Sequence, residues 1–291
     1  MRSQSTILDQ ASAVGIGLHD GLTSEVHLIP AEENTGIVFH LMEEWQCLER
    51  IPARIDSSID LPLRTAIASN GRSIGTIEHL MAAISAAEID NLTVKVWGNE
   101  IPILDGSSSR WCDLISNAGR QEQNQPRRFI RVTGEVMVSD DSGAWCSFSP
   151  ASSTELLTVD YEIDYDHPLI GRRSMEIGIT PTTFKNELSA ARTFGFIEDI
   201  GLIKELGLAR GASSNNTVVF GKHSLFDEDV PLRWTDEPLR HKIVDVVGDV
   251  FLAGLPIIGH FRGYKSGHRL NRDLVRSLID DETCWKTCTL A

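Results

Sequence analysis

The sequence predicts an α+β protein built from two similar halves. In the first half, a helix that starts near Thr76 is followed by a strand at 92–96. In the second half, a helix at 239–252 is followed by a strand at 256–261. Each helix carries a histidine near its start, and the flanking segments alternate polar and apolar residues as strands do. If the sheets lie outside and the helices inside, the two histidines converge at the interface between the halves, where sites often form.

A polar stretch at 118–128 separates the two halves. It lacks apolar periodicity, so we interpret it as an interdomain linker. The weak internal repeat then predicts two domains, at residues 1–120 and 127–291. Strand-like segments begin at Thr6 in the first domain and resume at Phe129 in the second.

The charge balance is acidic, with 41 Asp and Glu against 27 Lys and Arg and a net charge of −14 over 291 residues. Nucleic-acid binding needs basic patches, so we exclude that class of function. No run approaches the roughly 18 apolar residues of a transmembrane helix, and the N-terminal residues lack the apolar core of a secretory signal. We therefore expect a cytoplasmic protein without a transmembrane segment, and we expect a monomer.

The helix at 239–252 combines an apolar face with a polar stripe. His241, Asp245 and Asp249 are spaced four apart, so they stack on one side of the helix. A histidine and an aspartate one turn apart can bind one metal ion from a single rigid element. The spacing alone also fits an ordinary surface pair of His241 and Asp245.

The first helix offers a second candidate metal ligand. His79 lies in its first turn, where a neutral imidazole can bind a metal, and Glu78 beside it can act as a base on water. The HExxH pattern of the zincin proteases is absent.

Glycines at positions 15, 17 and 21 surround Leu18 and His19. Their spacing, and the absence of a predicted helix after them, exclude a dinucleotide-binding loop. A tight loop that presents these two side chains is one interpretation, and a solvent-facing hairpin histidine is the other. A second glycine-flanked loop, at 263–268, carries Lys265 and His268.

Five motifs occur in order between Thr6 and Trp285. They are Thr76-Ile77-Glu78-His79-Leu80, Ile103-Leu104-Asp105-Gly106-Ser107, Arg192-Thr193-Phe194-Gly195-Phe196, His241-Lys242-x-x-Asp245-x-x-x-Asp249 and Lys265-Ser266-Gly267-His268. Together they resemble the zinc-dependent UDP-3-O-acyl-N-acetylglucosamine deacetylases of lipid A biosynthesis. The resemblance implies two β-α-α-β domains with the helices sandwiched between two sheets. It also implies hydrolysis of the acetamide of a nucleotide-sugar acyl substrate.

Two alternatives stay open, and only the first shares the catalytic core. The first is a zinc amidase that acts on a different, smaller N-acyl substrate not linked to lipid A. The second is a non-catalytic zinc-binding or carbohydrate-binding relative. The presence of both Glu78 and His268 argues against the second alternative, because binding alone needs neither a general base nor a general acid.

The resemblance implies roles for the motif residues. The Zn²⁺ ligands would be His79, His241 and Asp245. Glu78 would be the base that takes a proton from water, and His268, held by Asp249, would protonate the leaving amine or stabilise the oxyanion. Thr193 would polarise the acetamide carbonyl together with zinc. Asp105 would orient a ligand histidine.

The resemblance also implies substrate contacts. The residues concerned are Leu18, His19 and Phe194. Lys242 and Lys265 flank the metal-site motifs in the sequence, which makes them the candidate cations for the diphosphate. Two positions depart from the family pattern. Ala144 stands where members commonly carry a lysine that contacts the nucleotide diphosphate, and Ala212 stands where they commonly carry a glycine able to take a positive φ.

Overall fold

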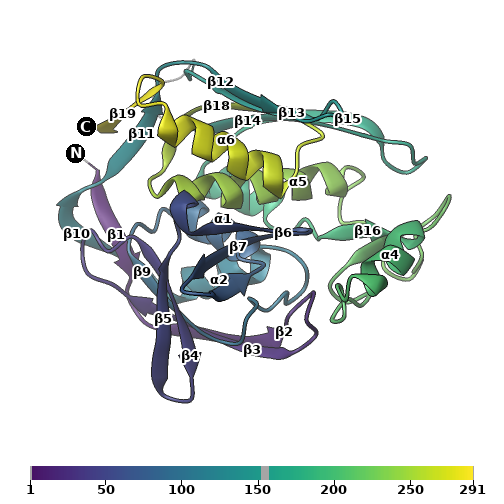
Figure 1. Cartoon of the computed structure of the whole chain (residues 1–291), viewed down its shortest axis with the longest axis horizontal. Coiled ribbons are helices and arrows are strands. Elements are labelled where there is room, and N and C mark those ends of the chain that lie inside the picture. Colours follow the sequence, from purple (N-terminus) through teal and green to yellow (C-terminus); the bar gives the residue numbers. More distant parts are fainter. Residues whose placement is uncertain (1, 152–156, 291) are drawn as a thin grey trace.

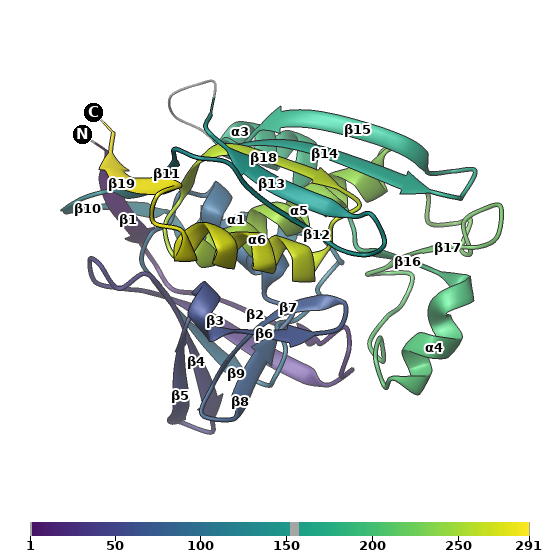
Figure 2. The same cartoon turned by 45° about the horizontal axis from the view of Figure 1, so that its top comes forward.

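The computed structural model describes residues 2–151 and 157–290, and it shows an α+β architecture with helices between two sheets (Figure 1). Figure 2 shows helices in the middle layer, with one sheet below them and the other above. These helices are α1 (Glu78–Ala86), α2 (Ser109–Ala118), α5 (Glu237–Val250) and α6 (His268–Asp280). The predicted fold class is therefore confirmed.

The sheet of the first half has five strands in the order β2–β3–β9–β4–β5. Their bounds are Ala11–Ile16 (β2), Thr23–Pro30 (β3), Ile37–Glu43 (β4), Gln46–Pro52 (β5) and Leu92–Trp97 (β9). Alternate residues of the central strands are fully buried, among them Val26, Phe39 and Val94. This alternation is what a strand shows when one face covers a core, and here that face packs on the helices.

A small three-stranded sheet leads into α1. It contains β6 (Ser58–Leu61), β7 (Arg64–Ser69) and β8 (Arg72–Gly75), and the short helix η1 (Ile55–Ser57) precedes it. The main-chain N–H of Ile77 donates to the carbonyl of Thr65 at 3.2 Å, so β7 is tied to the start of α1.

The sheet of the second half has seven strands. Its main path is β12–β13–β18–β11–β19, and β14 joins β18 to β15. The bounds are Arg128–Val132 (β11), Val136–Ser139 (β12), Trp145–Ser149 (β13), Leu157–Tyr165 (β14), Gly171–Gly178 (β15), Ile257–Tyr264 (β18) and Trp285–Thr289 (β19). Its buried face packs on α5 and α6 through residues such as Phe148, Tyr161 and Phe261.

The stretch predicted to link the two halves is a strand over most of its length. Residues 120–126 form strand β10 (Arg120–Pro126), which pairs antiparallel with β1 (Ser3–Ile7) near the chain ends (Figure 1). Side chains of β10 are mostly exposed on both faces, so the strand has no apolar alternation for a sequence pattern to reveal. The domain boundaries at 1–120 and 127–291 stay a proposal, and Met1 and Ala291 lie outside the described residues.

Between the second sheet and α5 the chain forms a side lobe of short elements, visible beside α4 in Figure 2. They are β16 (Phe194–Phe196), η3 (Ile197–Asp199), α4 (Ile200–Glu205) and β17 (Val218–Phe220). Before the lobe come α3 (Pro181–Thr183) and the short π-helix η2 (Phe184–Leu188), whose Phe184 and Leu188 are buried in the core; η4 (Phe251–Ala253) follows α5. Among the helices of residues 2–151 and 157–290, none is long and apolar enough to cross a membrane.

Candidate active site

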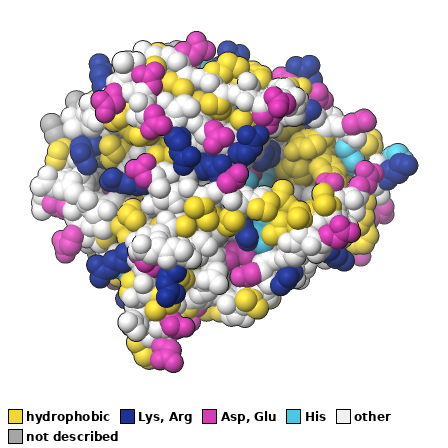
Figure 3. Space-filling model, viewed as in Figure 1, with side chains coloured by type: hydrophobic (Ala, Val, Ile, Leu, Met, Phe, Trp, Pro, Cys, Tyr) yellow, Lys and Arg dark blue, Asp and Glu magenta, His cyan; other side chains and the backbone are white. Residues whose placement is uncertain are grey.

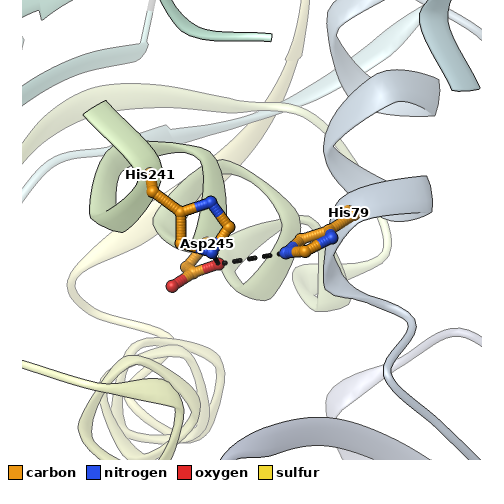
Figure 4. A group of neighbouring side chains, drawn as sticks. All are labelled: His79, His241 and Asp245. Atoms are coloured by element: carbon orange, nitrogen blue, oxygen red, sulfur yellow. Dashed lines mark ion pairs between the residues drawn. The ribbon is translucent and has the colours of Figure 1, made fainter. Parts of the chain in front are cut away.

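Helices α1 and α5 bring three predicted metal ligands together. His79 comes from α1, and His241 and Asp245 come from α5 (Figure 4). One donor atom of each residue lies within 4.8 Å of the other two. Asp245 Oδ1 is 3.4 Å from His241 Nε2 and 3.7 Å from His79 Nε2, so all three side chains face one point.

The hydrogen bonds of this group leave its metal-binding atoms open. His241 Nδ1 lies 3.0 Å from the carbonyl oxygen of Ala191, which fits a ring that donates from Nδ1 and turns an unprotonated Nε2 toward Asp245. Asp245 Oδ1 is buried, yet it accepts no hydrogen bond from the described residues. A buried carboxylate oxygen without a donor is costly unless a cation fills the gap.

Burial decides between the two interpretations of the α5 stripe. His79, His241 and Asp245 are all buried, and Asp249 one turn further on is fully buried. Burial also lowers the pKa of His241 to about 4, which keeps the imidazole neutral at physiological pH. The alternative of an ordinary surface pair is therefore wrong.

A second set of possible ligands lies on the other face of the second sheet. Asp160, Glu176 and His260 come from β14, β15 and β18, and their donor atoms also lie within 4.8 Å of one another. Glu176 is exposed, and Arg262 lies 3.5 Å from Asp160 and offsets its charge. The buried set on α1 and α5 is the better candidate for a metal.

A buried ion pair fixes the segment that holds His241. Arg192 Nε lies 2.8 Å from Glu237 Oε1, and the main-chain N–H of Arg192 donates to the same oxygen. Glu237 is the first residue of α5, and Arg192 follows Ala191, the partner of His241. Arg192 is buried, and the ion pair with Glu237 offsets the cost of burying its charge.

The two predicted acid–base residues lie beside the metal-ligand group. Glu78 Oε1 is 4.0 Å from His268 Nε2, and His268 Nδ1 is 3.0 Å from Asp249 Oδ2. Asn271 donates to the same oxygen of Asp249 at 2.9 Å. His268 is also the first residue of α6, a helix that we did not predict, although Leu270, Leu274 and Leu278 recur at helical spacing.

The structure adds one residue that the sequence gave no reason to choose. Thr65, at the start of β7, donates its main-chain N–H to Glu78 Oε2 at 3.1 Å. Its hydroxyl donates to Asp249 Oδ1 at 2.5 Å and lies 3.3 Å from His268 Nδ1. Thr65 therefore contacts both predicted acid–base residues and Asp249, which holds one of them.

The surroundings shift the pKa values of these groups in opposite directions. Burial raises the pKa of Glu78 above its ordinary value. Burial works against the charged form of His268, but Asp249 and Asp245 outweigh it and raise the pKa of His268 to about 9. At neutral pH, His268 is therefore a cation beside a carboxylate whose proton affinity is increased.

A cavity of about 670 Å³ opens onto this group. The predicted metal ligands and substrate-contact residues line it, as do Glu78, Thr193 and His268. Asp249 lies behind His268, and Asp105 is not part of the lining. Figure 3 shows hydrophobic side chains gathered around a hollow near β16 and α4. The structure thus brings the five motifs to one place.

The loop around Leu18 and His19 faces this cavity. Glu100 holds the loop, because its carboxylate accepts from the main-chain N–H groups of His19 and Asp20. Glu100 also accepts from the hydroxyl of Thr76, whose positive φ of 56° is strained for a β-branched residue. His19 is buried, so the solvent-facing alternative is wrong, and neither of its ring nitrogens has a hydrogen-bond partner among the described residues.

The segment that carries Thr193 packs against the Asp-Gly-Ser motif. The main-chain N–H of Thr193 donates to the carbonyl of Gly106 at 2.8 Å. Gly106 has φ of +82°, and a Cβ there would lie 1.7 Å from the carbonyl oxygen of Asn216. The predicted orientation of a ligand histidine by Asp105 is not supported, because Asp105 instead bonds to Ser107 and Arg233.

Several cations lie along the cavity. Lys242 is 3.0 Å from Asp245 Oδ2, and although burial opposes its charge, Asp245 raises its pKa. Lys265 and Arg269 line the wall near Ala144, and Arg269 pairs with Asp140 at 2.8 Å. The sequence had suggested the two lysines as cations for an anionic ligand, and Arg269 is a third.

A second, largely apolar pocket of about 320 Å³ adjoins the cavity. Both spaces share lining residues, among them Phe196, Ile203 and Ala212. Ala212 is not among the described residues with positive φ, so its Cβ costs no backbone strain and the expected penalty is absent.

The donor set and its neighbours are those of a metal-dependent hydrolase. Two histidines and one aspartate with open donor atoms form the kind of set that catalytic zinc sites use. A buried carboxylate and a cationic histidine stand beside that set, where acid–base catalysis needs them.

Comparison with known proteins gives the family. The model of the family described as LpxC, UDP-3-O-acyl N-acetylglycosamine deacetylase, matches residues 4–280. A UDP-3-O-acyl-N-acetylglucosamine deacetylase of Oleidesulfovibrio alaskensis is 41% identical over 280 residues, which cover 96% of this chain and 90% of that protein. Proteins of the same name from Brucella melitensis and Brucella ovis are 40% identical over 283 residues, covering 97% of each chain.

The chain belongs to the UDP-3-O-acyl-N-acetylglucosamine deacetylase family. This membership confirms the resemblance seen in the five motifs, and with it an enzyme of the deacetylase class. The comparisons favour this function over a zinc amidase for a smaller substrate.

Proposed function

We propose that this protein is a zinc-dependent deacetylase that hydrolyses the acetamide of UDP-3-O-acyl-N-acetylglucosamine in lipid A biosynthesis. The observation that carries the proposal is the convergence of His79, His241 and Asp245 with Glu78 and His268 on one cavity. The names of the relatives support the substrate.

The metal-ligand residues fit zinc. Neutral imidazole nitrogens and a carboxylate oxygen are ligands that Zn²⁺ accepts, and three protein ligands leave a position open for a reactant. The orphaned Oδ1 of Asp245 fits the same assignment. When bound, zinc supplies a Lewis acid that activates water and polarises an amide carbonyl.

Glu78 would serve as the general base. Its Oε2 accepts the N–H of Thr65, so Oε1 remains to take a proton from the attacking water. Burial raises its pKa, which strengthens the carboxylate as a proton acceptor.

His268 would act as the matching cation. Asp249 holds its Nδ1, so Nε2 faces Glu78 and the cavity. From there it can stabilise the oxyanion or give its proton to the amine nitrogen as the C–N bond breaks. Acetate and the free amine of the sugar are then the products, and one water is consumed.

Thr193 and the substrate contacts complete the proposal. Thr193 lines the cavity and would donate its hydroxyl to the acetamide oxygen. The apolar pocket beyond Phe194 and Phe196 would take the acyl chain, because burying methylene groups there is favourable. Leu18 and His19 would contact the sugar and the acyl chain of the substrate. Lys265 and Lys242 would contact its diphosphate.

The decisive experiment assays zinc-loaded protein on the UDP-linked acyl-sugar beside a panel of small N-acetyl compounds. We expect acetate release from the UDP-linked substrate. Release from a small compound alone would support the amidase alternative and overturn the proposed substrate.

The monomeric state and the cytoplasmic location stay predictions. The same holds for the division into domains at 1–120 and 127–291.

A further inference from the structure

Thr65 occupies a place between the proposed base and the proposed acid. It is buried at the start of β7, a strand of the small sheet that contains none of the predicted site residues. Its main-chain N–H reaches Glu78, and its hydroxyl reaches Asp249 and His268. One residue therefore touches both sides of the acid–base pair.

Each contact fixes a different atom. The N–H of Thr65 occupies Oε2 of Glu78, which leaves Oε1 directed at His268 Nε2, 4.0 Å away. The hydroxyl has one proton, and it donates that proton in the 2.5 Å hydrogen bond from Thr65 Oγ1 to Asp249 Oδ1. The oxygen then meets Nδ1 of His268 with a lone pair, so it accepts from the protonated ring.

Asp249 receives donors on both oxygens. Thr65 donates to Oδ1, while Asn271 donates to Oδ2 at 2.9 Å. His268 Nδ1 lies 3.0 Å from Oδ2 and 3.3 Å from Oδ1. Loss of the threonine hydroxyl leaves Oδ1 with only the weaker contact, so the carboxylate and the imidazole can turn together.

We propose that Thr65 is a positioning residue whose hydroxyl sets the orientation of the Asp249–His268 pair relative to Glu78. The inference rests on the roles proposed for Glu78 and His268. The main chain of residue 65 bonds to Glu78 and to Ile77 at the start of α1, and these bonds do not depend on the side chain. Substitution of the side chain therefore isolates the hydroxyl.

The first test compares Thr65→Val with Thr65→Ser in the zinc-loaded full chain. Valine keeps the shape and removes the hydroxyl, whereas serine keeps the hydroxyl. With the UDP-linked acyl-sugar we expect kcat to fall about tenfold to a hundredfold in Thr65→Val, with KM nearly unchanged, and to recover in Thr65→Ser. Thr65→Ala serves the same comparison if the valine variant does not fold.

A matched control is Thr6→Val on β1, where a buried threonine hydroxyl accepts from the N–H of Ala31 at 3.0 Å. It should keep the kcat of the wild type. Wild-type kcat in Thr65→Val, or equal losses in the valine and serine variants, would overturn the positioning role.

A second readout needs no substrate. The ¹H and ¹⁵N resonances of His268 Nδ1, measured in zinc-loaded protein, should shift in Thr65→Val and return in Thr65→Ser. If the wild type fails to turn over the UDP-linked substrate, the proposed function is refuted, and these resonances still decide the inference. Unchanged resonances in Thr65→Val would reject it.

Discussion

Gly248 of α5 lies directly against the main chain of Glu78 at the start of α1. A Cβ on residue 248 would lie 2.1 Å from the carbonyl oxygen of Glu78 and 3.0 Å from its Cα. The two helices therefore approach at the residue proposed as the base, between the turns that carry Asp245 and Asp249. Glycine costs helix stability, and this contact explains its presence.

Gly248→Ala should lower both stability and activity. The added methyl group meets main-chain atoms that cannot rotate away, so α1 and α5 must separate. Overpacking of this kind typically costs about 1–3 kcal/mol, and the shift displaces Glu78 from His268. Thermal unfolding and kcat measure the two effects. Gly201→Ala on α4, where nothing lies within 4 Å of an added Cβ, is the control and should unfold no earlier than wild type.

The metal assignment predicts one zinc per chain. His79→Ala and His241→Ala should each lower the zinc content measured by atomic absorption, because each removes one of three protein ligands. His260→Ala is the matched control, since it removes a histidine from the partly exposed second group. Full zinc content in the His79→Ala/His241→Ala double variant would disprove the assignment.

The acid–base roles predict a bell-shaped pH profile. Activity should fall at low pH as Glu78, whose pKa is raised by burial, gains a proton. It should fall at high pH as His268 loses its proton, at or below about 9, because a bound dication would lower its pKa.

Variants test which residue causes each limb. Glu78→Gln and His268→Gln should each lower kcat about a hundredfold or more while zinc stays bound. The basic limb should disappear in His268→Gln. If that limb is unchanged in the variant, His268 does not have this role.

The same group predicts a pH dependence of stability in the metal-free protein. The pKa of His268 is about 9 when folded, because Asp249 and Asp245 outweigh burial, against 6.5 for an unperturbed histidine. Its stabilising contribution is therefore fully present below about pH 6.5 and is lost as the pH rises toward 9. Thermal unfolding of wild type and His268→Gln across this range measures the contribution. Parallel curves for the two proteins would contradict the assigned shift.

The sequence predicted the residues proposed for metal binding and catalysis better than the residues that hold them in position. Glu78, His79 and His241 stand out because their side chains suit catalysis and because their motifs match a family. Thr65 and Glu100 do not stand out in the sequence, because their roles depend on partners that are far away along the chain. Thr65 meets Asp249 across 184 positions, a relationship that no local pattern encodes.

The lack of a local pattern also explains why strand β10 was not predicted. The helices and buried strands carry apolar periodicity, which a packed core imposes and a sequence pattern reveals. Strand β10 lies on the surface, where its ladder with β1 depends on main-chain hydrogen bonds and leaves side chains free to vary. A polar strand of this kind looks like a linker until its partner is known.

The last prediction concerns Ala144, where the chain departs from its family. Ala144 is buried in the cavity wall, close to Lys265 and Arg269, so a longer side chain there can extend into the cavity. A lysine ammonium that meets a phosphate forms a charge-assisted hydrogen bond, worth roughly 1.5–3 kcal/mol.

Ala144→Lys should therefore tighten binding of the UDP-linked substrate at least several-fold, with little change in kcat. Asp140, whose main-chain N–H donates to the carbonyl of Ala144, competes for the new cation and limits the gain. Ala144→Met, of similar length without charge, is the control and should not tighten binding. KM values for the three proteins measure the effect. Equal gains in the lysine and methionine variants would show that packing, and not the charge on the diphosphate, is responsible.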